Sequence, residues 1–290
     1  MSERILSRDW QDYQLLDSGL GRKLEQFGPY RLIRPEPRAV WKPGLPAGNW
    51  ADVEAEFVPA KQGGGGKWEK RAPLPERWQI GYRDLKMWVI LENSRQVGVF
   101  PENGAHWDWI RAQIARHGGQ PQVLNLFGYT GLASLAAAKA GAAVTHIDSA
   151  RRAVALGRDN QALNNLGDKP IRWIVEDAVK FARREVKRGN RYEGIIFDPP
   201  KYGLGPKQER WSFFEGFENL CRVLRDCFSG KPQFMVVTAY ALESPPEVLQ
   251  PGLEILLDGL GGELTLGVLG VNEKSAGRKL DLSVTARWSA

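Results

Sequence analysis

Residues 123–131 read Val-Leu-Asn-Leu-Phe-Gly-Tyr-Thr-Gly, and this stretch decides the fold class. It overlaps a short apolar run, residues 122–127, and an alanine-rich segment, residues 132–140, follows it. A strand, a glycine turn and a helix in this order are typical of an α/β unit. Gly128 and Gly131 permit a tight turn and a close approach of the backbone to a ligand, because neither carries a Cβ. The G-x-G-x-x-G pattern is incomplete, so the turn alone only weakly distinguishes a nucleotide site from an ordinary strand–helix connection.

The alternation of strands and helices continues towards the C-terminus. Strands are expected at 143–147, 171–175, 192–197 and 233–238, and helices at 151–164, 179–188 and 215–227. Two further strands, 263–271 and 280–288, face each other across residues 272–279. We therefore predict an α/β fold with a doubly wound, mainly parallel, seven-stranded Rossmann-like sheet and an antiparallel C-terminal hairpin.

Residues 1–105 differ in composition and are expected to form a smaller, β-rich domain, with residues 106–290 as the second domain. Eight of the eleven tryptophans lie before residue 110. Alternating apolar residues predict strands within 52–59 and 78–92. Gly63–Gly66 is expected to form a mobile loop tip, either an ordinary surface hairpin or a loop that closes over a substrate.

The composition is that of a globular protein, with 290 residues, 42% hydrophobic and 26% charged. No run of about 18 apolar residues predicts a membrane span, and the charged N-terminus does not resemble a secretory signal. Two cysteines, Cys221 and Cys227, favour a reduced, cytoplasmic compartment, and three histidines without ligand spacing predict no metal site. The net charge of +6 favours a polyanionic partner only mildly, and no pattern predicts an oligomeric state.

Polar residues stand at the ends of three successive predicted strands. Asn125 lies in the first strand, Asp148 ends the second, and Asp177 follows the third. A carboxylate about 20 residues after the glycine turn can accept hydrogen bonds from both hydroxyls of a ribose. Asp177 could accept from an adenine amine. Either aspartate could instead cap the helix that follows it.

The fourth strand leads into Asp198-Pro-Pro-Lys-Tyr202. Two prolines make a stiff, extended exit without backbone donors, which leaves the Asp198 carboxylate and nearby carbonyls as acceptors. Tyr202 offers a ring for stacking. Such a site suits a planar amine or a nucleobase, whereas a plain turn is the alternative.

Taken together, these motifs resemble the class I S-adenosylmethionine-dependent methyltransferases. The likeness is greatest to the bacterial 23S ribosomal RNA large-subunit methyltransferases of the cytosine-C5 and guanine-N7 type, and covers residues 82–290. It rests on NLFGYTG at 125–131, HIDSA at 146–150, RDNQALNN at 158–165, VEDA at 175–178 and FDPPKYG at 197–203, with GVFPE before residue 103.

The resemblance implies a set of site residues. The cofactor, S-adenosylmethionine, would be bound by Asn125, Phe127, Gly128, Thr130, Gly131, Asp148, Ser149, Asp177, Ala178 and Asp198. The catalytic, substrate-facing positions would be Asp198, Pro199, Pro200 and Tyr202. Lys201, Lys207, Arg210 and Trp211 follow directly and are expected to contact RNA, as basic residues beside an aromatic one.

The sequence departs from the cytosine-C5 pattern in one respect. Those enzymes carry a nucleophilic cysteine just after the fifth strand, where this chain has Val237-Thr-Ala-Tyr240. A thiolate is needed there because C5 is a poor nucleophile until C6 has been attacked. A nucleobase nitrogen needs only positioning for in-line attack on the methyl group, so we expect nitrogen methylation. Lys201 occupies the place where the nitrogen-methylating pattern often has an aromatic residue, which here comes one position later.

Three alternatives remain open at this level. A nicotinamide-dependent oxidoreductase could use the same kind of sheet, although the missing glycine and the Asp-Pro-Pro turn count against it. An RNA-binding relative without catalysis is conceivable because the cysteine is lost. A methyltransferase acting on a protein or a small molecule also fits. The basic run 180–191 is either a solvated helix face or a phosphate contact, and Lys274, Arg278 and Lys279 form a second basic set.

Overall fold

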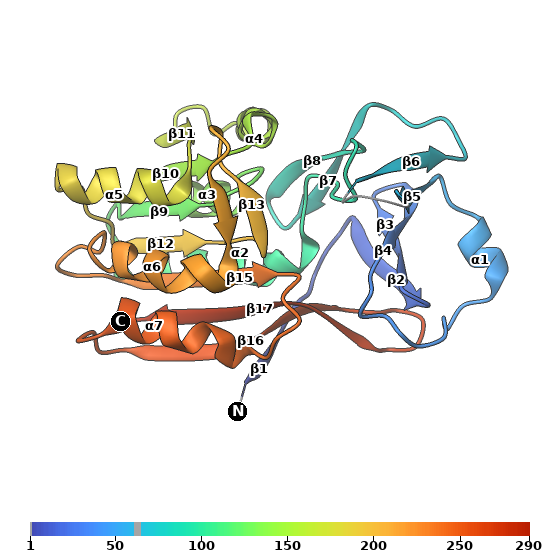
Figure 1. Cartoon of the computed structure of the whole chain (residues 1–290). Coiled ribbons are helices and arrows are strands. Elements are labelled where there is room, and N and C mark those ends of the chain that lie inside the picture. Colours follow the sequence, from blue (N-terminus) through green and yellow to red (C-terminus); the bar gives the residue numbers. More distant parts are fainter. Residues whose placement is uncertain (1, 61–64) are drawn as a thin grey trace. The chain divides into compact units, whose positions relative to one another are not determined.

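The computed structural model describes residues 2–60 and 65–290. The chain divides into two compact units (Figure 1). The first contains residues 1–5, 105–269 and 282–290, and the second contains residues 6–104 and 270–281. The tip of the C-terminal hairpin thus belongs to the same unit as the N-terminal strands, which the sequence did not predict. We call the units the C-terminal unit and the N-terminal unit.

An eight-stranded sheet is built mainly by the C-terminal unit (Figure 1). In spatial order its strands are β1 (Glu3–Ser7), β16 (Glu263–Asn272), β17 (Lys279–Ser289), β15 (Phe234–Tyr240), β12 (Gly194–Phe197), β9 (Gln122–Leu126), β10 (Ala143–Asp148) and β11 (Ile171–Val175). β15, β12, β9, β10 and β11 are parallel, and β17 is antiparallel to β15. The predicted fold class is confirmed, and β1 is an additional edge strand.

Helices precede, connect and follow the parallel strands; the sequence predicted the four that connect them, but not those at 104–117 and 250–257. They are α2 (Gly104–His117), α3 (Leu132–Lys139), α4 (Arg151–Leu163), α5 (Ala178–Arg188), α6 (Phe213–Arg225) and α7 (Gln250–Leu257), with short 3-10 turns η1 (Pro101–Asn103) and η2 (Pro246–Leu249). Successive strand residues point to opposite faces of the sheet. In β12, Ile195 and Phe197 pack with α5, α6 and α7, whereas Ile196 packs with α2 and α3. The sheet is therefore apolar on both faces, as parallel sheets are.

The N-terminal unit holds a five-stranded sheet and a separate strand pair. The sheet contains β2 (Tyr13–Gly19), β3 (Arg22–Phe27), β4 (Tyr30–Pro35), β5 (Ala55–Pro59) and β6 (Gly66–Lys70), and the pair is β7 (Arg77–Tyr82) and β8 (Leu85–Ile90). A short helix, α1 (Ala47–Ala51), precedes β5. Of the predicted tetraglycine loop, Gly63 and Gly64 lie outside the described residues, and Gly66 begins β6.

Among the described residues, none of the helices combines the length and hydropathy that a membrane-spanning segment needs.

Candidate active site

The turn after β9 has an unusual backbone conformation. Phe127 and Tyr129 have positive φ angles of 54° and 51°, and Gly131 follows with 78°. Non-glycine residues seldom adopt this left-handed region, and such outliers gather at functional sites. The Gly128 N–H donates to the Ile147 carbonyl at 3.0 Å, and the Gly131 N–H donates to the Gly128 carbonyl at 3.0 Å. The turn is thereby fixed against the end of β10.

The two glycines of this turn make room for side chains of the protein itself. A Cβ on Gly128 would lie 2.4 Å from His146 Cε1, and a Cβ on Gly131 would lie 2.3 Å from Trp173 Cη2. The sequence predicted that these glycines let the backbone approach a ligand. In the structure these glycines are packed against rings of the protein, so a side chain at either position would displace the buried His146 or the half-buried Trp173.

Asn125 lies beneath the turn in a buried polar chain. Its Nδ2 donates to Ser134 Oγ at 2.8 Å, and Ser134 Oγ lies 3.0 Å from His146 Nδ1. Burial lowers the pKa of His146 to about 3, so the imidazole is neutral at physiological pH. Asn125 is not among the residues that line the cavity described below, and Thr130 is also buried. Both residues support the turn from within the protein.

Asp148 at the end of β10 ties the turn to the next helix. Its Oδ2 accepts from the Tyr129 N–H and its Oδ1 from the Ala150 N–H, each at 2.8 Å. Burial raises the pKa of Asp148 above its ordinary value, against the lowering effect of these N–H groups. Asp177 is the N-cap of α5, where it accepts from the Lys180 N–H at 2.8 Å. Asp177 thus caps α5 through its Oδ1, whereas α4 takes Ala150 as its N-cap.

A small cavity of about 40 Å³ lies where these strand ends meet. Residues predicted to bind cofactor or substrate form most of its wall: Phe127, Asp148, Ser149, Asp177, Ala178, Pro200 and Trp211. Glu176, Gly203, Leu204 and Gly205 complete it and were not predicted as site residues. Glu176 could have been found as the acidic neighbour of Asp177 at the same strand end. Pockets for small organic ligands usually exceed about 300 Å³, so this cavity holds only part of such a ligand.

The Asp198-Pro-Pro exit of β12 is joined to this cavity by Trp211. The Asp198 N–H donates to the Leu126 carbonyl at 3.2 Å, which sets the exit beside the end of β9. Trp211 Nε1 donates to the Pro200 carbonyl at 2.6 Å, and its ring lies 5.3 Å from that of Phe127. The structure therefore places Trp211 in the cavity wall, whereas the sequence placed it with the residues that contact RNA.

A short hairpin carries the rest of the predicted substrate residues. It consists of β13 (Tyr202–Leu204) and β14 (Arg210–Ser212), with Gly203 opposite Trp211. Lys180 on α5 forms an ion pair with Glu209 in the hairpin, which lowers the pKa of Glu209 to about 2. Three large apolar side chains are exposed on or beside the hairpin, namely Tyr202 (69%), Leu204 (57%) and Phe214 (57%). Lys207 and Arg210 are exposed there too.

Several basic side chains of the run 180–191, on α5, form ion pairs with glutamates. Besides Lys180, Arg184 pairs with Glu176 at 2.8 Å and Arg188 with Glu185 at 3.0 Å. These glutamates neutralise much of the positive charge that the sequence suggested as a contact for phosphate groups.

Neither cysteine is available as a nucleophile. Cys221 on α6 and Cys227 just after this helix are free thiols, both fully buried in the core. Burial raises the pKa of Cys227 to about 12 and that of Cys221 further, so both remain protonated and inert. Within residues 2–60 and 65–290, no three His, Cys, Asp or Glu side chains are grouped to hold a metal ion.

Comparison with known proteins agrees with this geometry. A family model of S-adenosylmethionine-dependent methyltransferases matches residues 59–226, more than half of the chain. The chain belongs to this family. The crystal structure of a SAM-dependent methyltransferase from Agrobacterium tumefaciens is 38% identical, with a TM-score of 0.95, and the match covers 100% of this chain and 94% of that one. This methyltransferase therefore uses S-adenosylmethionine, as predicted.

Curated relatives connect the methyltransferase with ribosomal RNA enzymes. Ribosomal RNA large subunit methyltransferase I of Shewanella frigidimarina is 41% identical over 99 residues, which are 34% of this chain and 25% of that protein. Ribosomal RNA large subunit methyltransferase K/L of Chromohalobacter salexigens is 27% identical over 217 residues, 71% of this chain and 28% of that protein. The chain spans about a quarter of the length of these relatives. The predicted resemblance to the large-subunit methyltransferases is confirmed.

Proposed function

We propose that this methyltransferase transfers a methyl group to a nucleobase nitrogen in ribosomal RNA. One observation supports this most strongly: the Asp198-Pro-Pro exit lies against the cavity formed by the ends of β9, β10 and β11 and continues into an exposed aromatic and basic hairpin. The proposed cofactor site, acceptor groups and RNA-binding surface would thus adjoin one another.

The cavity wall has the chemistry that S-adenosylmethionine requires. Asp148 presents carboxylate oxygens for the two ribose hydroxyls, and Asp177 and Ala178 would hold the adenine. Asp148 and Asp177 give the wall acidic groups beside Glu176, which is paired with Arg184, and acidic groups suit a cation. When bound, the cofactor supplies a methyl group on a positively charged sulfur. The residues of the chain then have to orient the acceptor and keep water away.

Asp198 and the Pro199 carbonyl are the acceptors that would orient the base. The Pro200 carbonyl already receives the Trp211 indole N–H, so it serves to fix the exit. Hydrogen bonds from a base N–H group to Asp198 would direct the nitrogen lone pair towards the methyl group and stabilise positive charge that develops on the nitrogen. The buried thiols provide no covalent route to cytosine C5, which favours a nitrogen target.

The hairpin supports RNA as the acceptor. Tyr202 and Leu204 would offer apolar faces to an unstacked base, and the exposed Lys207 and Arg210 would contact its phosphates. A nucleobase must leave its stack before an enzyme can reach its edge. The names of the relatives, both ribosomal RNA large subunit methyltransferases, favour ribosomal RNA among nucleic acids.

Transfer of a labelled methyl group tests this function. Purified protein and labelled S-adenosylmethionine would be incubated with ribosomal RNA from cells lacking the gene, and separately with total protein from the same cells. We expect label in the RNA, lost with Asp198→Ala but kept with the matched surface variant Asp226→Ala. Label in the protein fraction alone would contradict the proposal.

A further inference from the structure

The N-terminal unit contains a second cavity, of about 370 Å³, within the size range of small-ligand sites. It is lined by Leu16, Leu24, Leu45, Arg31, Asn49, Lys274 and Ser275, which come from β2, β3, β4, the α1 region and the tip of the C-terminal hairpin. All of these residues belong to one compact unit. The proposed methyl transfer makes no use of this cavity.

A β-bulge in β2 shapes one wall. The pairing of β2 with β3 shifts between Leu15 and Asp17, so Leu16 is the extra residue. Leu15 is buried in the core, whereas Leu16 remains partly exposed and lines the cavity. The carbonyl oxygens of Leu15 and Leu16 accept the N–H groups of Lys274 (2.9 Å) and Ser275 (3.1 Å). Bulges often re-aim a side chain next to a functional site, and this one also docks the hairpin tip.

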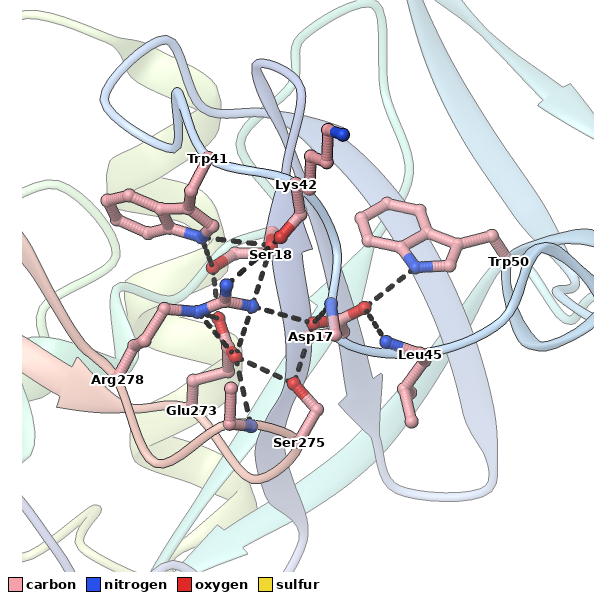
Figure 2. A network of polar contacts seen from close by, with 11 residues as sticks. Asp17, Ser18, Trp41, Lys42, Leu45, Trp50, Glu273, Ser275 and Arg278 are labelled. Atoms are coloured by element: carbon pink, nitrogen blue, oxygen red, sulfur yellow. Dashed lines mark hydrogen bonds and ion pairs between the residues drawn. The ribbon is translucent and has the colours of Figure 1, made fainter.

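A buried polar network fixes the surrounding segments (Figure 2). The Asp17 carboxylate accepts hydrogen bonds from the Gly44 and Leu45 N–H groups, the Trp50 indole and the Ser275 hydroxyl, at 2.6–3.0 Å. Burial alone would raise the pKa of Asp17, but these donors lower it below its ordinary value. Arg278 bonds Asp17 at 3.1 Å and also pairs with Glu273. The cavity is therefore held in a defined shape before any ligand binds.

The polar network occupies one member of the second basic set, which consists of Lys274, Arg278 and Lys279. Arg278 is committed to buried carboxylates, and its guanidinium also lies over the Trp41 ring at 5.3 Å. Lys274 lines the cavity, and no ion pair of its ammonium group occurs within the described part of the chain. Arg31 stands beside it with one nitrogen bonded to Asp52 at 2.6 Å. The cavity thus combines a leucine surface with cationic groups and the amide of Asn49.

We propose that this cavity holds one unstacked base of the RNA substrate, with its phosphate at Lys274 and Arg31. The leucines accept the apolar face of a base, and the Asn49 amide can both donate to and accept from a base edge. The cations provide the salt-sensitive part of the binding. This inference rests on RNA being the acceptor in the proposed function, and it assigns the N-terminal unit a share in substrate binding.

Two variants of the full chain test the cavity. Leu16→Trp fills it with an indole, and Lys274→Ala removes the unpaired charge; Lys70→Ala, an exposed lysine on β6, is the matched control. Binding of a fluorescent single-stranded fragment of ribosomal RNA would be measured at several salt concentrations. We expect Leu16→Trp to weaken binding about tenfold, as loss of one bound base does. Lys274→Ala should lower the slope of log affinity against log salt by about one.

The outcomes separate this inference from the proposed function. If Leu16→Trp keeps the melting temperature of the wild type and binds RNA with the same affinity and salt slope, the cavity is not an RNA site. If Leu16→Trp unfolds, an unchanged salt slope in Lys274→Ala overturns the inference by itself. Methyl transfer to RNA by the wild type, measured on the same samples, reports on the proposed function separately. Wild-type transfer combined with unaffected binding in both variants would reject only the cavity.

Discussion

The indole Nε1 of Trp211 donates to the carbonyl oxygen of Pro200 at 2.6 Å, and the same ring lies 5.3 Å from Phe127. One side chain thus joins the Asp-Pro-Pro exit of β12 to the turn after β9. In the proposed mechanism, this contact fixes the acceptors of the base relative to the cofactor turn.

Removing this hydrogen bond while keeping an aromatic ring should impair catalysis more than cofactor binding. Trp211→Phe is expected to lower kcat about fivefold, the value of one hydrogen bond of about 1 kcal/mol, with cofactor Kd within about twofold of wild type. Trp288→Phe is the matched control, because it also removes an indole-to-carbonyl hydrogen bond, to Gly261 at 3.0 Å. Equal losses of kcat in the two variants would show a merely structural role.

Asp148 is expected to carry most of the cofactor's ribose binding. Asp148→Ala should weaken S-adenosylmethionine binding at least tenfold by calorimetry, through loss of a charged acceptor and of the bond that holds the Tyr129 N–H. Asp168→Ala, an exposed aspartate, should bind like wild type. If Asp148→Ala binds S-adenosylmethionine with unchanged affinity, Asp148 does not contact the ribose of the cofactor.

The stability of the chain should fall as the pH drops below 6.5. His146 and His106 are buried, and burial lowers the pKa of both, for His146 to about 3. The unfolded chain binds these protons near pH 6.5 and the folded chain does not, so protons favour unfolding. Each histidine contributes a slope approaching about 1.4 kcal/mol per pH unit well below pH 6.5.

Urea unfolding between about pH 5 and 6.5 measures this slope. His106→Gln should reduce it by about half. A slope that His106→Gln leaves unchanged would mean that this imidazole is not held neutral in the folded chain.

The cysteines should be dispensable for chemistry. Cys221→Ala with Cys227→Ala is expected to reduce the free energy of unfolding by roughly 1 kcal/mol per site, because each leaves a small void in the core. Methyl transfer per folded molecule should stay within about twofold of wild type. A double variant that folds but is inactive would mean that a cysteine thiol takes part in the reaction.

Much of the C-terminal unit could be predicted because its strands and helices have local patterns. The apolar run of β9 and the alanine-rich α3 have the local preferences of a strand and a helix, and glycines permit the turn between them. The edge strand β1 was missed because its five residues carry two charges and gain a partner only from β16, far along the chain.

The sequence indicated which strand ends lie together at the site, but not the direction in which each side chain points. Asp148, Asp177 and Pro200 meet at one cavity because parallel strands end at a common edge. The directions of the Asn125 and Trp211 side chains could not be predicted, since they depend on partners such as Ser134 and the Pro200 carbonyl, which sequence spacing does not reveal.

Mass analysis of the methylated nucleosides tests the central claim most directly. Ribosomal RNA from cells lacking the gene would be treated with the pure protein and S-adenosylmethionine, then digested to nucleosides beside an untreated sample. The account predicts a gain of one nucleoside methylated on a nitrogen of its base, absent with Asp198→Ala. Formation of 5-methylcytidine would contradict it, because carbon methylation requires a nucleophile that the buried thiols do not supply.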